Sequence, residues 1–191
     1  MSTDTMKKST EDLLRMPAEG LKDKLSLALE EIEKYGIGKL LEEHPDFLAR
    51  LLNRLKLMDA AKLFNEVAGV SDRLTNLLWE GVALRAGQSK DMKSVLQKNE
   101  RDCHINIEAS DSPFKHHFTV EKEKITGGSG LLHFKDEDFR FMGPTEVLID
   151  LLTGDLSLGF SNLQLQFAGH PGWISRLTPV IQEISKLLKG C

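Results

Sequence analysis

The sequence predicts an α+β protein, in which an N-terminal helical region is followed by a five-stranded, mainly antiparallel sheet with helices packed on one face. Two observations support this prediction. Apolar residues recur at helical spacing up to about Lys98, and from about Arg101 they alternate with polar residues at the period of a strand. Two apolar helices with well-marked ends then follow the first strands, and they are available to cover the apolar face of the sheet.

Glycine, proline and capping residues divide the N-terminal region into short helices. Residues 1–8 are expected to form a disordered tail. Ser9 begins the first helix, because a hydroxyl followed by acids suits the free amides of a first turn. Further helices are predicted over residues 21–35, 46–57, 59–69, 71–87 and 89–98. Asp59 and Ser71 are the expected N-caps of two of them. Residues 9–99 therefore form a helical region, which we expect to serve as a lid, a dimerisation element or a docking surface.

Strands are predicted where polar and apolar residues alternate. Residues 103–109 and 114–120 each have one apolar and one polar face, the pattern of an antiparallel sheet with one face in water. Three more strands are predicted over residues 131–134, 139–142 and 163–167. We interpret Gly127–Gly130 as a flexible connection between strands. It lacks both the Lys-Ser/Thr pair and the following helix that a phosphate-binding loop needs.

The two helices expected to cover the sheet span residues 144–153 and 171–189. Each begins at a proline and is followed by a glycine, the arrangement that suits the first turn and the C-terminal end of a helix. The second helix carries a continuous apolar stripe. It also contains Pro179, which is expected to kink it.

Composition limits the class of protein. The chain has 191 residues, of which 40% are hydrophobic and 28% are charged, as is usual for a globular protein. Its net charge of −4 gives no reason to expect a nucleic-acid partner. Cys103 and Cys191 make neither a disulfide framework nor a metal-ligand spacing, which indicates a reducing, cytoplasmic location. There is no apolar run of signal-peptide or membrane-spanning length.

Asp138–Leu188 follows the order strand, helix, strand, helix, and contains the run Leu151-Leu152-Thr153-Gly154-Asp155-Leu156. A strand then ends at Gly169, and the last helix begins near Trp173. With the strands from Arg101 onward, this segment resembles the sterol carrier protein family, small α+β domains that bind sterols, fatty acyl chains and other lipids. The linker Ser157–Asn162 is shorter than is usual in that family.

The resemblance implies that residues 100–191 form a sterol-carrier-like lipid-binding domain with a tunnel between the sheet and the helices. The family also occurs as an accessory module in larger proteins. The candidate ligand-binding residues are the apolar side chains of the two last helices and the strand between them: Leu148, Leu151, Leu152, Phe160, Leu163, Leu165, Phe167, Trp173 and Leu177. The alternative for these residues is a solid core, since apolar stripes at helical spacing usually are core.

We therefore expect non-enzymatic binding or transfer of a hydrophobic lipid, such as a fatty acyl chain, a sterol or an isoprenoid. No catalytic constellation, cofactor or metal is expected. Adjacent His116 and His117 point to opposite faces of their strand and cannot chelate together. His116, on the apolar face, is interpreted as a core group or as a lone polar contact for a lipid head group.

The competing hypothesis is a protein-interaction or accessory scaffold, in which the helical half binds a partner protein or forms a homodimer. Residues 51–62 also place basic side chains beside an apolar stripe, the pattern of a helix in transient membrane contact. Acidic and basic residues balance in this half, with 16 of each before Glu100, which favours a packed helical bundle over a membrane-bound helix.

Overall fold

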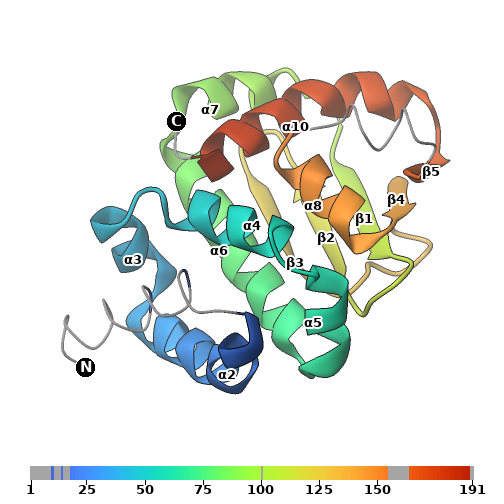
Figure 1. Ribbon diagram of the computed structural model, residues 1–191. Coiled ribbons are helices and arrows are strands. Elements are labelled where there is room, and N and C mark those ends of the chain that lie inside the picture. The colour runs from blue at the N-terminus through green and yellow to red at the C-terminus, as the bar shows by residue number, and fades with distance from the viewer. Residues whose placement is uncertain (1–9, 11–13, 15–17, 100, 155–163, 190–191) are drawn as a thin grey trace.

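The computed structural model describes residues 10, 14, 18–99, 101–154 and 164–189 (Figure 1). The predicted disordered tail, residues 1–8, lies outside the described residues. The N-terminal region is helical, as the sequence predicts. Its helices are α2 (Ala18–Tyr35), α3 (Ile37–Glu43), α4 (Phe47–Lys56), α5 (Ala60–Glu66), α6 (Val70–Gln88) and α7 (Lys90–Gln97).

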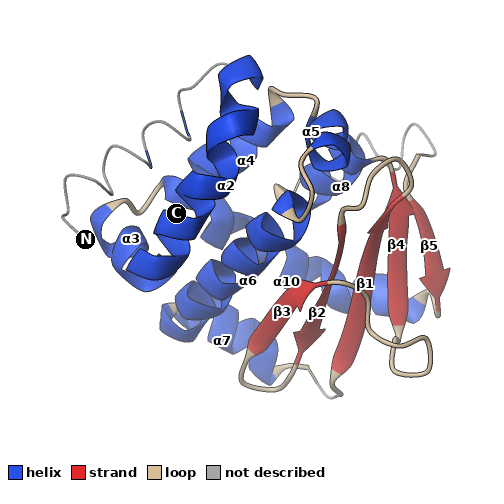
Figure 2. Ribbon diagram, turned by 90° about the horizontal axis from the view of Figure 1, so that it is seen from below, coloured by secondary structure: helices blue, strands red, loops and turns tan. Residues whose placement is uncertain are grey.

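The second half of the chain forms the sheet and its two covering helices. The strands are β1 (Cys103–Ala109), β2 (Lys115–Val120), β3 (Ile125–Ser129), β4 (Phe139–Gly143) and β5 (Gln166–Gly169), and the helices are α8 (Thr145–Leu152) and α10 (Gly172–Lys189). The strand order is β3-β2-β1-β4-β5, and only the central β1–β4 pair is parallel. The predicted α+β class, with a mainly antiparallel five-stranded sheet, is confirmed. Figure 2 shows that the helices lie on one side of this sheet.

The register of the strands places the apolar residues on the helix-covered face. Ile107 of β1 lies opposite His116 of β2 on one side and Phe141 of β4 on the other. Ile105 lies opposite Phe118 in the same way. This is the face that the alternation of residues 103–109 and 114–120 predicts to be buried, because successive side chains of a strand point to opposite faces.

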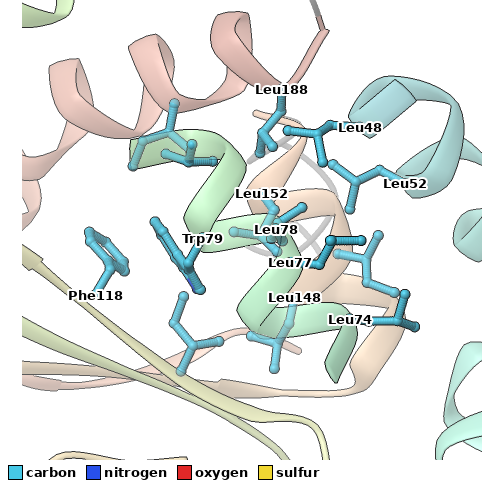
Figure 3. Close-up of a cluster of buried hydrophobic side chains, with 14 of the residues drawn as sticks. Leu48, Leu52, Leu74, Leu77, Leu78, Trp79, Phe118, Leu148, Leu152 and Leu188 are labelled. Atoms are coloured by element: carbon cyan, nitrogen blue, oxygen red, sulfur yellow. The ribbon is translucent and has the colours of Figure 1, made fainter. Parts of the chain in front are cut away.

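Helix α6 joins the helical region to the sheet. It lies along β3 and also contacts β2 and α10. The Trp79 side chain, 1% exposed, stacks on Phe118 with the ring centroids 4.9 Å apart. Figure 3 shows Trp79 between Phe118 and a group of leucines from several helices. Buried apolar residues from Leu25 to Leu188 belong to one continuous core, so the helical region and the sheet share their interior.

The close approach of α6 explains why the predicted third strand is wrong. We expected a flexible connection at Gly127–Gly130 and a strand at residues 131–134, but Ile125–Ser129 form β3 and residues 131–134 form a loop and turn. A Cβ atom on Gly127 would lie 2.5 Å from Cδ2 of Trp79. The glycine is therefore needed for the contact between α6 and β3. The resulting glycine-rich sequence of β3 is similar to that of a loop.

Residues 130–138 lie across the outer face of the sheet, where Asn106 holds them. The Asn106 side chain accepts a hydrogen bond from the Leu132 amide at 2.8 Å and donates to the Leu132 carbonyl at 3.1 Å. It also donates to the Glu137 carboxylate. The buried polar Asn106 is thus fully used in fixing this crossing. Phe134, in the same segment, is 77% exposed.

Of the two predicted N-caps, Asp59 is confirmed and Ser71 is not. Asp59 caps α5 by accepting a hydrogen bond from the Lys62 amide at 2.9 Å, as predicted. Ser71 is not an N-cap, because α6 begins one residue earlier and Gly69, in the left-handed region, occupies the cap position. Helix α10 continues through Pro179. No helix in the described part of the chain is long and apolar enough to cross a membrane.

Candidate functional site

The candidate site is the apolar layer between the helix-covered face of the sheet and helices α8 and α10. Five of the predicted site residues are buried in the core: Leu148, Leu151, Leu152, Leu165 and Leu177. They come from both helices and from the residue just before β5. The structure therefore brings these five residues into one apolar region.

The other four predicted residues have different positions. Phe167 is 42% exposed, because β5 is an edge strand, and its ring stacks on Phe139 with the centroids 5.7 Å apart. Trp173 is partly buried against the core, and the Arg176 guanidinium lies 5.5 Å from the centre of its ring. Phe160 and Leu163 lie outside the described residues, as does the linker Ser157–Asn162.

A small apolar cavity lies inside this layer. Its volume is about 10 Å³, and its walls come from α6, the sheet, α8 and α10: Trp79, Ile107, Phe118, Phe141, Leu151, Leu152, Ile181 and Ile184. Every lining side chain is hydrophobic. The space would admit a single water-sized probe, and a cavity without polar partners stays dry. In this conformation the layer is closed around its own side chains, so a ligand has to separate the helices from the sheet.

Trp79 is the wall residue that sequence reasoning assigned only to the helical region. The missed signal lies in α6, whose apolar side chains do not keep to one face. Its buried residues include Leu74, Leu77, Leu78, Trp79 and Val82. A helix that is apolar over several faces is covered on several sides. Together with the paired glycines of β3, this pattern could have indicated that α6 packs against the sheet.

His116 is the polar side chain beside this layer. Trp79 Nε1 donates a hydrogen bond to His116 Nδ1 at 3.0 Å. Complete burial, assisted by the nearby charge of His117, lowers the pKa of His116 from 6.5 to about 3. The ring is therefore neutral at ordinary pH, and because Nδ1 accepts, Nε2 carries the hydrogen. Nε2 has no hydrogen-bond partner within the described residues. The site thus holds one unused donor close to an apolar cavity.

Polar contacts anchor the N-terminal end of α8. The Asp111 carboxylate accepts hydrogen bonds from the Thr145 amide at 2.9 Å and from the Thr145 hydroxyl at 2.6 Å. The Ser112 hydroxyl lies 2.7 Å from that of Thr145. The Thr145 side chain is completely buried, so these bonds replace the water it would otherwise bind.

The Thr153-Gly154 pair in the run that carries the family resemblance closes α8 against α10. Gly154 adopts φ 78°, and its amide bonds to the Leu151 carbonyl at 3.1 Å. The Ser185 hydroxyl of α10 donates to the Thr153 carbonyl at 2.6 Å. A Cβ on Gly154 would lie 2.4 Å from the Ser185 oxygen, so glycine is required both by the backbone angle and by this contact.

The titratable groups of the sheet are engaged in structural contacts. Arg140 is paired with Glu108 and Glu137, each with a nitrogen–oxygen distance of 2.8 Å. Burial, with a smaller effect of the Asp138 charge, raises the pKa of the Cys103 thiol to about 12, so the thiol stays protonated at neutral pH. No group of three metal-ligating side chains occurs among the described residues.

Comparison with known proteins gives matches only among solved structures. No model of a protein family matches the sequence, and neither does any curated protein. The UbiJ-SCP2 ubiquinone synthesis protein matches over 56% of this chain and 96% of its own, with 12% identity and a TM-score of 0.43.

Two further structures carry the name sterol carrier protein. One is apo sterol carrier protein 2 from Yarrowia lipolytica, with 15% identity, a TM-score of 0.40, and coverage of 60% of this chain and 91% of its own. The other is a hypothetical protein from Thermus thermophilus, described as a candidate sterol carrier protein, with 11% identity, a TM-score of 0.45, and coverage of 60% and 86%. The chain is similar to sterol carrier proteins. The order of elements in residues 101–188 predicts similarity to the same family.

Proposed function

We propose that this protein binds a hydrophobic lipid, without chemical conversion, between the sheet and helices α8 and α10. The observation that supports the proposal most directly is the enclosed cavity, whose eight lining side chains are all hydrophobic. It lies where the sheet meets α6, α8 and α10. An acyl, sterol or isoprenoid group entering there would contact only apolar side chains.

The energy of burying a long apolar chain is comparable with the cost of binding it. Transfer of a dozen methylene groups out of water contributes roughly 10 kcal/mol, at about 0.8 kcal/mol each. Association costs about 4–15 kcal/mol, and separation of the packed side chains adds to that cost. A long chain or a sterol is therefore favoured over a small apolar molecule, because only a large apolar area can offset both costs.

The layer has to expand, and the connections of α8 show how it can. Helix α8 is tied at one end by Asp111 and at the other by Ser185, while most of the side chains buried along its middle are apolar. Lys56 of α4 also pairs with Asp150 on α8, at 2.6 Å. In the part of the chain that the structure describes, no side-chain hydrogen bond joins α8 to a strand, so displacement of its centre from the sheet would break none between those two elements.

The test is native mass spectrometry of the protein purified from cells, followed by lipid extraction and titration with a fluorescent acyl probe. A co-purifying lipid, or saturable probe binding, is the expected result. The Ile184→Trp substitution adds more volume than the cavity holds, and it should weaken probe binding in a variant that urea unfolding shows to be folded. The Leu57→Trp substitution adds the same side chain at a position that is 83% exposed, and should leave binding unchanged. Absence of both lipid and probe binding would refute the proposal.

Partner binding through the helical region, by a second copy or another protein, has one observation in its favour. A groove of about 630 Å³ lies between α3, the end of α6 and the end of α10, and Leu41, Leu84 and Leu187 are among its lining residues. Leu84 is exposed there. Light scattering on size-exclusion chromatography, with Leu84→Glu as the variant, tests self-association directly. A monomer for both proteins at all concentrations would exclude the homodimer.

A further inference from the structure

A second groove, separate from the apolar layer, lies between α7 and α10, which Figure 1 shows side by side. Its volume is about 360 Å³, within the range of small-ligand sites. The lining residues come from the end of α7 and from the first half of α10: Val95, Lys98, Asn99, Ser175, Arg176, Pro179 and Val180. None of them lines the apolar cavity.

Among its described lining residues, the groove has two cationic side chains and no acidic one. Lys98 and Arg176, both exposed, lie on opposite helices, and neither aspartate nor glutamate is among the lining residues. Lys98 follows directly after α7, where a cation is favoured by the negative end of the helix dipole. Its position therefore has an explanation that needs no ligand.

Arg176 has no such explanation. It lies in the second turn of α10, near the positive end of that helix dipole, where a cation gains nothing from the helix. Its guanidinium lies over the Trp173 ring, 5.5 Å from the centroid, which holds it in one place at the rim of the groove. A groove lined by a guanidinium and an ammonium group is suited to an anion with several oxygens, because arginine can donate two parallel hydrogen bonds.

The floor of the groove is apolar. Val95, Pro179 and Val180 provide it. Pro179 has no amide hydrogen, so the Ser175 carbonyl lacks the helical partner that residue 179 would otherwise supply. The lining of the groove therefore combines two cationic side chains with three apolar ones. This combination matches a phosphate ester on a small alcohol such as glycerol better than it matches a bare inorganic ion.

We propose that the groove between α7 and α10 binds the phosphate group of a phosphate ester, with Arg176 and Lys98 as its direct contacts. The same chemistry is presented by a soluble ester and by the head group of an anionic phospholipid. The inference is independent of the proposed function, since the two sites share no lining residue.

The experiment uses the full-length protein in two arms. In the first, glycerol 3-phosphate is titrated by calorimetry at low salt. In the second, co-sedimentation is measured with phosphatidylcholine vesicles that do or do not contain phosphatidic acid. The Arg176→Gln variant should bind at least about tenfold more weakly in the arm that shows binding, as expected for loss of a charge-assisted bidentate contact. The Arg176→Lys variant, which keeps the charge but not the fork, should lie between that variant and wild type.

The control is Lys122→Gln, which removes the same single charge from an exposed position outside the groove. This control should bind like wild type. Binding in the first arm identifies a soluble ester as sufficient, and binding only in the second identifies a membrane head group. Equal losses in the control and the groove variants, or no binding in either arm, would overturn the proposal. Acyl-probe binding is measured on the same variants and should not change, so failure of either proposal is seen separately.

Discussion

Replacement of His116 by phenylalanine should remove a large part of the acid sensitivity of this protein. In the folded state, burial keeps the His116 ring neutral and lowers its pKa from 6.5 to about 3. In the unfolded chain the ring is in water and binds a proton below about pH 6.5. Above that pH the ring is neutral in both states, and the stability associated with its burial is fully present.

The magnitude follows from the difference between the two pKa values. As the pH falls below 6.5, the unfolded chain gains a proton that the folded protein cannot accept, so the free energy of unfolding decreases until the pH reaches about 3. The whole shift corresponds to roughly 5 kcal/mol. Of this, about 3 kcal/mol should be lost between neutral pH and roughly pH 4.5. This loss is a large fraction of the stability of an ordinary domain.

The assay is urea unfolding, monitored by tryptophan fluorescence, at a series of pH values between neutral pH and roughly pH 4.5. At neutral pH the His116→Phe variant should be less stable than wild type by about 1–3 kcal/mol, because Trp79 Nε1 loses its acceptor. As the pH falls, the two curves should converge, since the variant lacks the titrating ring. The control His133→Phe, in an exposed loop, leaves His116 in place and should keep the wild-type slope. Parallel curves for wild type and His116→Phe would show that the reasoning is wrong.

Two further substitutions test how the helices are joined to the sheet. Gly127→Ala should destabilise the protein by about 1–3 kcal/mol in urea unfolding, because its Cβ would lie 2.5 Å from the Trp79 ring. Gly87→Ala, where the new atom meets nothing within 4 Å, should instead stabilise α6 by about 0.5–1 kcal/mol. If both variants changed the free energy of unfolding in the same direction, this explanation would be contradicted. Asp111→Ala leaves the Thr145 amide and hydroxyl without their acceptor and should cost about 1–3 kcal/mol. An unchanged midpoint would mean that α8 is not anchored there.

Much of the fold could be predicted because its signals are local. The period of the apolar residues identifies the helices of the first half and strands β1 and β2, and Asp59 fixes the start of α5 through its own side chain. Strand β3 could not be predicted in this way. Gly127 is required by the approach of Trp79, which is distant in the sequence, so this glycine reflects a tertiary contact and not a local preference.

The candidate site was predicted in part for the same reason. Leu151 and Leu152 line the cavity, because a short apolar helix beside a sheet must turn such residues inward. Trp79 could not be assigned to this layer from periodicity alone, since apolar residues on several faces of α6 indicate that it is covered on several sides but not what covers each side. Phe167 is exposed because β5 lies at the edge of the sheet, and strand order is not visible in an alternating pattern.

The contact of α6 with β3 has a consequence for biosynthesis. Helix α6 ends at Gln88, whereas β3 begins only at Ile125, so a ribosome completes the helix well before it makes the strand that covers Trp79. At about 5–20 residues per second, this delay is on the order of seconds. During that interval the nascent chain carries an apolar helix face with no partner. Chaperone capture of stalled chains ending between these two elements should therefore be stronger than that of chains extended past Ser129.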